Sequence, residues 1–223
     1  MTRKIRIAHL ITRLELGGAQ QNTLYCCGRH DRKKYEVVLL AGAGGILDES
    51  ARALPDVTLH LLPYLKHPIH PFWDFLAFFK LARLLKDERI DLLHTHSSKA
   101  GILGRWAAKK AGIPCVVHTI HGWGFHPRQF PPARWVYQTL ERLTAPITDA
   151  LIGVAQENVR EGLAAGIGRP EQYRVIHSGI IPSEFKTNAS RSKKNRRMWG
   201  IARRPCVLVL SNFKKQKAPM DVL

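Results

Sequence analysis

The 223-residue sequence lacks any long hydrophobic run and has few cysteines. No stretch approaches the roughly 18 to 20 uninterrupted apolar residues that cross a bilayer, which excludes a membrane-spanning segment in this sequence. The four cysteines form neither a CxxC pair nor a ladder of spacings, a pattern typical of reduced thiols in a cytosolic protein. Apolar residues make up 45% of the chain, so wholesale disorder is excluded as well.

The N-terminal residues do not have the pattern of a secretory signal peptide. The first residues, MTRKIRIAHLI, begin with basic side chains, but the apolar run is short, is broken by His9 and precedes no small-residue cleavage site. This favours a strand over a signal peptide. The sequence therefore predicts a cytoplasmic protein.

Acidic residues are scarce. The chain has 17 Asp and Glu against 35 Lys and Arg, a net charge of +18. Residues 183–223 hold 11 of the basic and two of the acidic residues, half of the net charge, most densely in NASRSKKNRRMWGIARR. Such a run is typical of a solvated linker or helix face, or of a surface facing anionic lipid or nucleic acid. Trp199 is its one aromatic residue, so stacking on bases is not indicated and no nucleic-acid partner is expected.

Periodicity predicts the fold class. Short runs rich in β-branched residues or Leu recur along the chain, and most are separated by stretches with helical spacing, which predicts an α/β Rossmann-like parallel sheet with helices on both faces. The expected strands cover residues 4–11, 35–41, 57–62, 91–95, 115–120, 149–154 and 173–177.

A domain boundary is expected between Pro182 and Asn188, where proline and polar residues gather. We therefore assign residues 1–182 to a first domain and 183–223 to a linker and the start of a second. In the second, Arg191–Trp199 is expected to be helical and Pro205–Leu210 a strand. The final residues, LSNFKKQKAPMDVL, complete a strand, an anion-binding turn and the beginning of a helix, the opening unit of a nucleotide-binding domain that needs a continuation.

Ligands of parallel sheets bind beyond the carboxyl ends of the strands, so the residues after each strand are the candidates for a site. The first strand is followed by TRLELGGAQQN, in which Gly17 and Gly18 would let the backbone approach an anion at the start of a helix. The alternative is an ordinary loop with a tight turn, because no GxGxxG is present there. We interpret the AGAGG segment at residues 41–45 as turn glycines.

Histidines follow the fourth and fifth strands, in DLLHTHSSKAGILGRWAA and HTIHGWGFH. We expect His94 and His118 to be buried for structural reasons, and His96 and His121 to face a ligand. A metal site is the alternative, but neither a carboxylate nor a cysteine stands at ligand spacing. Ser97 or Ser98 is expected to cap the next helix, and small residues should give that helix a flat side. These small residues are Ala100, Gly101, Gly104, Ala107 and Ala108.

In this order, the segments LGGAQ, DLLHTHSSKAGILGRWAAKKAGIP, VVHTIHGWGF, VIHSGI and VLVLSNFKKQKAP resemble the family 4 glycosyltransferases of the GT-B fold, over essentially the whole chain. The resemblance implies two facing Rossmann-like domains, of which the N-terminal one mostly takes the acceptor and the C-terminal one holds the nucleotide-sugar donor. It also implies transfer with retention of anomeric configuration, without metal or other cofactor. On this reading the chain is an N-terminal domain followed by a truncated donor domain, and is expected to be inactive by itself.

The resemblance assigns roles to individual residues. Gly17, Gly18 and Lys217 match positions that bind the donor phosphates, and His121 matches the histidine beside the transferred sugar, our catalytic candidate. Asn212 stands where the family usually has arginine, which leaves one phosphate contact in doubt. The acceptor or sugar side is expected to include His96, Ser97, Lys99, Gly122, Ser178 and Gly179. Ser178 and Gly179 match the family's Asn-Gly pair, with Ser in place of Asn.

The function implied is transfer of a sugar to a glycan or lipid-linked acceptor in cell-envelope or polysaccharide biosynthesis. Two alternatives stay open: a sugar-nucleotide epimerase on the same fold, and a basic nucleic-acid-binding protein. A possible membrane contact is HPFWDFLAFFKLARLLK, residues 70–86, where aromatic side chains precede Lys80, Arg83 and Lys86. We interpret it either as an interfacial helix on an anionic membrane, which would make the protein peripheral, or as ordinary core packing.

Overall fold

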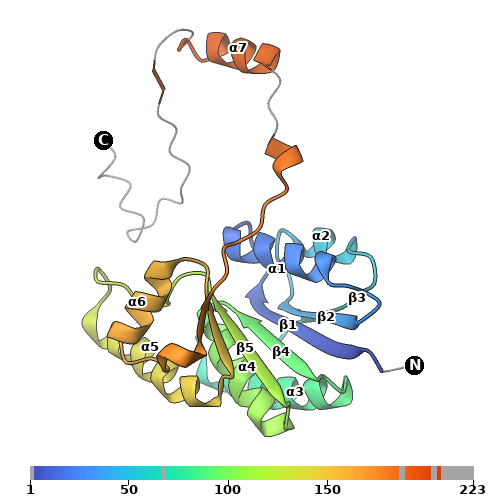
Figure 1. Cartoon of the computed structure of the whole chain (residues 1–223). Helices are drawn as coiled ribbons and strands as arrows, with labels where there is room; N and C mark the ends of the chain where they lie inside the picture. Colours follow the sequence, from blue (N-terminus) through green and yellow to red (C-terminus); the bar gives the residue numbers. More distant parts are fainter. Residues whose placement is uncertain (1–2, 67–68, 186–188, 202–204, 207–223) are drawn as a thin grey trace. The chain divides into compact units, whose positions relative to one another are not determined.

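The structure is a computed structural model, and it describes residues 3–66, 69–185, 189–201 and 205–206. The chain divides into two compact units, Met1–Ser178 and Gly179–Leu223, and each is described by itself. The first unit contains a parallel sheet and six α-helices, and the second contains one described α-helix (Figure 1).

Seven strands form one sheet in which every neighbouring pair is parallel, in the order β3-β2-β1-β4-β5-β6-β7. This confirms the fold class and the positions of the seven strands expected in the first domain. The longest buried runs are in β1 and β2, as expected for strands of a parallel sheet that is covered on both faces. The strands are β1 (Ile5–Arg13), β2 (Tyr35–Gly42), β3 (Val57–Leu62), β4 (Leu92–His96), β5 (Cys115–Ile120), β6 (Ala150–Gly153) and β7 (Tyr173–Val175).

Helices cover both faces of the sheet, with α1 and α2 on one side and α3 and α4 on the other (Figure 1). Among the described helices, none has the length and apolar character that crossing a bilayer requires. The helices of the first unit are α1 (Gly18–Arg29), α2 (Asp48–Arg52), α3 (Pro71–Asp87), α4 (Ser98–Ala111), α5 (Pro131–Thr144) and α6 (Gln156–Ala164), with 3-10 turns η1 (Ala145–Ile147) and η2 (Pro170–Gln172).

Alternating side chains of the central strands build a core on each face. Leu10, Leu40 and Leu93 point to the α3 and α4 side, where they pack with Leu81 and Leu85 of α3. On the opposite face, Ile11, Val37 and Leu39 pack with Cys27 of α1 and Ala51 of α2. The predicted flat side of α4 is confirmed, because all five of its small residues are buried.

The strand order reverses between β1 and β4. The chain runs outward from β1 through β2 to β3, then crosses back to place β4 on the other side of β1. In an open parallel sheet, the crevice outside the carboxyl ends of the two strands at such a reversal is where ligands bind. The topology therefore directs attention to the residues that follow β1 and β4.

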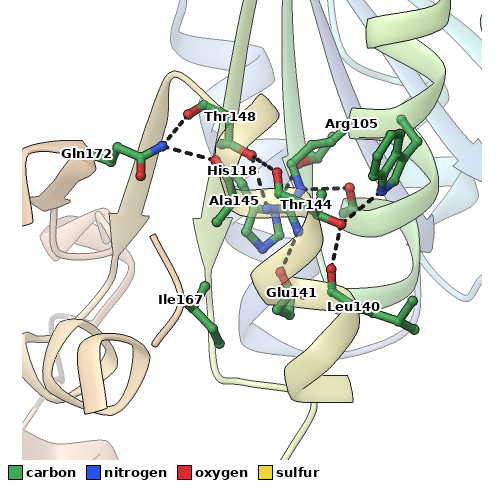
Figure 2. A network of polar contacts seen from close by, with 12 residues as sticks. Arg105, His118, Leu140, Glu141, Thr144, Ala145, Thr148, Ile167 and Gln172 are labelled. Atoms are coloured by element: carbon green, nitrogen blue, oxygen red, sulfur yellow. Dashed lines mark hydrogen bonds and ion pairs between the residues drawn. The ribbon is translucent and has the colours of Figure 1, made fainter. Parts of the chain in front are cut away.

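A buried ion pair joins α4 to α5 (Figure 2). The guanidinium of Arg105, fully buried on the flat side of α4, donates to Oε2 of Glu141 at 2.6 Å, to the carbonyl of Gly101 at 2.9 Å and to the hydroxyl of Thr148 at 3.2 Å. Gln172 donates to the carbonyl of Thr148 at 2.6 Å and so ties η2 to the same network. Because each partner is hydrogen-bonded, both charges are tolerated in the core.

The second unit begins at Gly179 and holds the 3-10 turn η3 (Pro182–Phe185) and helix α7 (Ala189–Met198). This confirms the helix expected over Arg191–Trp199, with a start two residues earlier. Gly200 follows the end of α7 by two residues, and its φ of +66° is the left-handed conformation common after helices. The strand expected at Pro205–Leu210 lies mostly outside the described residues, and Asn212 and Lys217 lie entirely outside them.

Candidate functional site at the carboxyl ends of β1, β4 and β5

The loop after β1 leads into the amino terminus of α1 at the strand reversal. Gly17 is the N-cap, with extended backbone at φ −177°, and no side chain caps the first amides of α1. Apart from its chain neighbours and the backbone of its own helix, no described residue comes within 4 Å of where a Cβ on Gly18 would stand, so the space beside this residue is open. Uncapped amides at a helix start bind anions well, which fits the phosphate role expected for this glycine pair.

Thr12 and Ser97 join the ends of β1 and β4. The Ser97 backbone has φ +65°, a strained conformation for a residue other than glycine. Its hydroxyl makes no cap hydrogen bond; it lies 2.8 Å from the Thr12 hydroxyl. The Thr12 hydroxyl instead accepts from the amide of Ala100 in the first turn of α4, at 3.1 Å. Ser97 is therefore the N-cap residue of α4, as expected, but its side chain makes no capping hydrogen bond, because the hydroxyl of Thr12 on the neighbouring strand accepts from the α4 amide instead.

His96 is fully buried within a group of imidazoles. His94 and His96 share a face of β4, as expected, with ring centroids 4.3 Å apart. The Nε2 atom of His96 lies 3.0 Å from Nδ1 of His9 on β1, and its Nδ1 lies 3.1 Å from Nε2 of His121. Both ring nitrogens are thus engaged inside the protein. The expectation that His96 faces a ligand is wrong, because His9 and His121 cover the two sides of its ring.

His121 follows β5 and is the partly buried member of this group that lies at the strand ends. Its Nε2 contacts His96, while no described residue is hydrogen-bonded to its Nδ1. Burial lowers the pKa of His121 to about 4, so the ring is neutral at physiological pH. The next residue, Gly122, has φ +148°, which side-chain-bearing residues rarely adopt. His121 therefore presents one free nitrogen beside a turn that requires glycine.

His94 and His118 have polar partners within the sheet. His118 is buried, with Nδ1 2.9 Å from the Thr95 hydroxyl, and burial together with the charge of Arg105 holds its pKa well below the usual range. His94 is partly buried, with Nε2 2.7 Å from the Thr119 hydroxyl. Burial, with a smaller contribution from the nearby His121, lowers the pKa of His94 to about 3. Both rings are neutral, as structural histidines should be.

The structure does not bring every candidate to this site. The ammonium of Lys99 lies 2.5 Å from Oδ1 of Asp74 on α3, in a largely buried ion pair, so it is committed to holding α4 on α3. Ser178 and Gly179 are exposed where the chain passes between the two units. Lys217 is outside the described residues. Of the expected set, Gly17, Gly18, His96, Ser97, His121 and Gly122 follow or end β1, β4 and β5.

Residues that could hold a metal ion are His9, His94 and His96, whose ring nitrogens lie within 4.8 Å of one another. Sequence reasoning missed His9, since it stands 85 positions before His94 and only the pairing of β1 with β4 places them opposite each other. The set offers neutral imidazoles but no carboxylate or thiolate to balance a buried divalent charge.

The structure also has a cavity of about 490 Å³ at the opposite edge of the sheet, and its lining includes Lys4, Tyr35 and Val57. These residues precede or begin β1, β2 and β3, so the cavity lies at the amino ends of the strands. Parallel sheets bind ligands at the carboxyl ends. The general rule therefore favours the carboxyl ends of the strands, where His121 lies, as the candidate site.

Sequence comparisons extend this picture. The profile of the glycosyl transferase 4-like domain matches residues 17–179. The chain is 32% identical over 222 residues to the UDP-Gal:alpha-D-GlcNAc-diphosphoundecaprenol alpha-1,3-galactosyltransferase of Escherichia coli, covering 97% of this chain and 56% of that protein. It is 27% identical over 173 residues to the N,N'-diacetylbacillosaminyl-diphospho-undecaprenol alpha-1,3-N-acetylgalactosaminyltransferase of Campylobacter jejuni, covering 74% and 46%. The chain spans about half the length of these curated relatives.

Solved structures share the fold. Anabaena Alr3699/HepE in complex with UDP and glucose superposes with a TM-score of 0.68 at 22% identity, over 89% of this chain and 51% of that chain. A putative UDP-N-acetylglucosamine 2-epimerase from Listeria monocytogenes superposes with a TM-score of 0.57 at 16% identity, over 77% and 45%. At these identities, the likeness shows the arrangement of the Rossmann-like half and nothing finer.

Proposed function

The chain belongs to the glycosyl transferase 4-like family, and from that premise we propose that the whole protein moves a sugar from a nucleotide-sugar donor to a lipid-linked acceptor in cell-envelope polysaccharide synthesis. The name of the Escherichia coli relative specifies UDP-galactose as donor and a diphosphoundecaprenol-linked sugar as acceptor. The Campylobacter relative is also named for a diphospho-undecaprenol acceptor. These names support the donor and acceptor classes proposed here.

One observation supports the proposal: the Gly17–Gly18 pair and His121 follow strands of one parallel sheet at the same, carboxyl end. Gly17 and Gly18 stand at the amino terminus of α1 after β1, and His121 stands after β5, two strands away in the sheet. A diphosphate at the first amides of α1 would meet the positive end of the helix dipole. The sugar attached to it would then lie toward His121.

The chemistry follows from charge development in the transition state. The departing nucleoside diphosphate gains negative charge, which the α1 amides would stabilise, together with Lys217 from the second domain. We propose retention without a covalent enzyme intermediate, since the acidic residues in the loops that follow β1 and β2 make contacts within the protein. Glu15 pairs with Arg13 at 3.0 Å, and Asp48 accepts from the amides of Gly44 and Gly45. His121 would support the sugar by a hydrogen bond from Nδ1.

The direct test is a transfer assay with the full-length protein. We expect radiolabelled sugar to move from a nucleotide sugar, with UDP-galactose tried first, onto an undecaprenyl-diphosphate-linked sugar. Because we propose a metal-free reaction, EDTA should leave the rate unchanged. Formation of an epimerised sugar nucleotide without acceptor would favour the epimerase alternative instead. A rate abolished by EDTA and restored by a divalent cation would contradict the metal-free part.

Helix α3 supports a membrane contact, as a lipid-linked acceptor would require. Its aromatic-basic surface consists of Phe72, Phe75 and Phe79 followed by Lys80, Arg83 and Lys86. Phe72 and Phe75 are 64% and 65% exposed, whereas Leu81 and Leu85 on the other side of the helix are buried in the core. One side of the helix therefore packs in the core, as one interpretation of the sequence expected. The other side presents aromatic rings beside cations, as an interfacial helix would. We propose that this side lies on an anionic bilayer at its cytoplasmic surface.

Replacing Phe72 and Phe75 together with serine should weaken vesicle binding by the full-length protein roughly 100-fold, since each buried ring contributes about 1.5 kcal/mol or more. Co-sedimentation with vesicles containing phosphatidylglycerol at low salt measures this. Ile46→Ser, at another highly exposed position in the loop before α2, is the matched control and should bind normally. Equal binding to neutral vesicles, or an undiminished double variant, would exclude the proposed surface.

A further inference from the structure

Four histidines form one continuous row of short contacts through the site. Nε2 of His30, at the end of α1, lies 2.9 Å from Nε2 of His9. Nδ1 of His9 lies 3.0 Å from Nε2 of His96, and Nδ1 of His96 lies 3.1 Å from Nε2 of His121. All three separations are within hydrogen-bonding range. The row crosses neighbouring strands β1 and β4 and connects the far end of α1 with the strand-end site.

Neutral imidazoles impose one direction on such a row. Each neutral ring has one N–H and one lone pair, and each contact between two rings needs an N–H from one ring and a lone pair from the other. His9 and His96 use both of their ring nitrogens within the row. If His9 donates from Nδ1, then His96 must donate from its own Nδ1 to His121. If His9 donates from Nε2, then His96 must donate from Nε2 and receive from His121.

We propose that this row is a tautomer relay, in which the hydrogen-bonding state of His30 decides whether Nδ1 of His121 offers a donor or an acceptor to the bound sugar nucleotide. In the donor pattern, His9, His96 and His121 all carry their proton on Nδ1. In the acceptor pattern, all three carry it on Nε2. Its role in catalysis rests on the proposed function, in which His121 meets the donor sugar. A sugar hydroxyl can pair with either pattern, but a phosphate oxygen or a sugar ring oxygen only accepts hydrogen bonds, so binding of such an oxygen at Nδ1 of His121 selects the donor pattern.

The surroundings keep the row neutral. Burial holds the pKa values of His9 and His96 well below the usual range, with His94 adding to both shifts. Burial and the charge of Arg32 lower the pKa of His30 as well. Among the described residues, no carboxylate is hydrogen-bonded to any of the four rings. A cationic imidazole has no lone pair and would break the row, so neutrality is the condition for the relay.

Reversal of the row balances in protons. Each ring in the middle receives a proton at one nitrogen and gives one from the other. Passing from the acceptor to the donor pattern therefore takes up one proton at Nδ1 of His121 and releases one from Nδ1 of His30. His30 is partly exposed, and no described residue is hydrogen-bonded to its Nδ1, so water can take that proton.

The metal alternative uses the same atoms differently. If the cation took the two nitrogens in contact, Nδ1 of His9 and Nε2 of His96, both would have to offer a lone pair, and their 3.0 Å contact could then hold no hydrogen bond. It would also bury two positive charges without an anionic ligand, near the guanidinium of Arg32. The hydrogen-bonded row satisfies every nitrogen it uses and needs no added charge.

Two opposite substitutions at position 30 test the relay. Arginine can only donate, so His30→Arg should set His9, His96 and His121 to protonated Nδ1. An ionised glutamate can only accept, so His30→Glu should set all three to protonated Nε2, and Arg32 supplies its counter-charge. Two-bond ¹H–¹⁵N spectra of the ¹⁵N-histidine-labelled chain report which nitrogen carries the proton. The matched controls introduce the same two charges at a histidine outside the row, as His126→Arg and His126→Glu. They should leave the tautomers of His9, His96 and His121 as in the wild type.

His96 is the decisive readout, because it does not touch position 30. We expect His96 to take opposite tautomers in the two variants. In the wild-type chain, we expect His9 and His96 to have the same tautomer. Unlike tautomers in the wild type, or His96 unmoved in both variants, would overturn the relay. Histidine spectra that change on EDTA and return with Zn²⁺ would overturn it in favour of a metal.

Activity is measured separately in the full-length protein. We expect the His30→Glu variant to turn over about 10-fold more slowly than the His30→Arg variant. This is the effect of losing one hydrogen bond from Nδ1 of His121 to a charged or polarised ligand. If the tautomers differ between the two variants but the turnover does not, the relay exists but has no role in catalysis. That result would overturn the catalytic part of the proposal. Absence of transfer in the wild type would instead count against the proposed function, while the tautomer result would still stand by itself.

Discussion

Replacing His121 with alanine in the full-length protein is expected to lower turnover by roughly 100-fold or more, the effect of removing one well-placed stabilising group. The imidazole is held on one side by His96 and leaves Nδ1 free beside the strand ends, where the transferred sugar would lie. The ring is only partly buried and belongs to none of the apolar clusters, so the fold should persist. Transfer assays and thermal melting measure the two effects separately.

A matched control is available in the same loop. His126 is also partly buried, but its ring is absent from the imidazole row, and His126→Ala should keep nearly full activity. If His121→Ala transfers sugar at the wild-type rate, His121 does not belong to the site. If it loses activity only because the melting temperature collapses, its role is structural and the assignment is wrong.

Arg105→Ala is expected to destabilise the 223-residue chain by roughly 3–5 kcal/mol, because it leaves the carboxylate of Glu141 buried without its partner. Both side chains are almost completely excluded from water, and the guanidinium also satisfies Gly101 and Thr148. Removing both charges together, with Arg105→Met and Glu141→Leu, should recover most of the loss. Urea unfolding followed by circular dichroism provides the measurement.

An exposed pair on α6 serves as the comparison. Arg160 and Glu157 lie 3.2 Å apart with side chains 71% and 63% exposed, so Arg160→Ala should change stability by about 0–1 kcal/mol. If Arg105→Ala unfolds at the same urea concentration as Arg160→Ala, the buried pair does not hold α4 and α5 together as described.

The fold could be predicted from the sequence because its signals are local. The strands of this sheet are short runs rich in β-branched residues or Leu, so β3 and β5 were located to the residue and β7 to within two residues of its end. The small side chains of α4 likewise predicted its packed side. Arg105 stands among them, yet nothing in its neighbours shows that Glu141, 36 positions later, would pair with it.

Sequence patterns located residues of the candidate site only where they come soon after a strand. Gly17 and His121 follow the apolar runs of β1 and β5, and their roles stay predictions. His9 and His30 were missed, since their contacts depend on the pairing of β1 with β4 and on where α1 ends. The one local signal was a histidine interrupting the apolar run of β1. His96 and Ser97 were placed near the right edge but given the wrong contacts, because His9 and Thr12 come from the neighbouring strand.

The central claim is that the carboxyl ends of β1, β4 and β5 form the donor-sugar side of a glycosyl-transfer site. A crystal structure of the full-length protein with a bound, non-hydrolysable sugar nucleotide tests it most directly. The account predicts the diphosphate at the amides of Gly17 and Gly18, and a sugar oxygen within about 2.6–3.2 Å of Nδ1 of His121. A sugar bound elsewhere, with Nδ1 of His121 in contact with water alone, would contradict it.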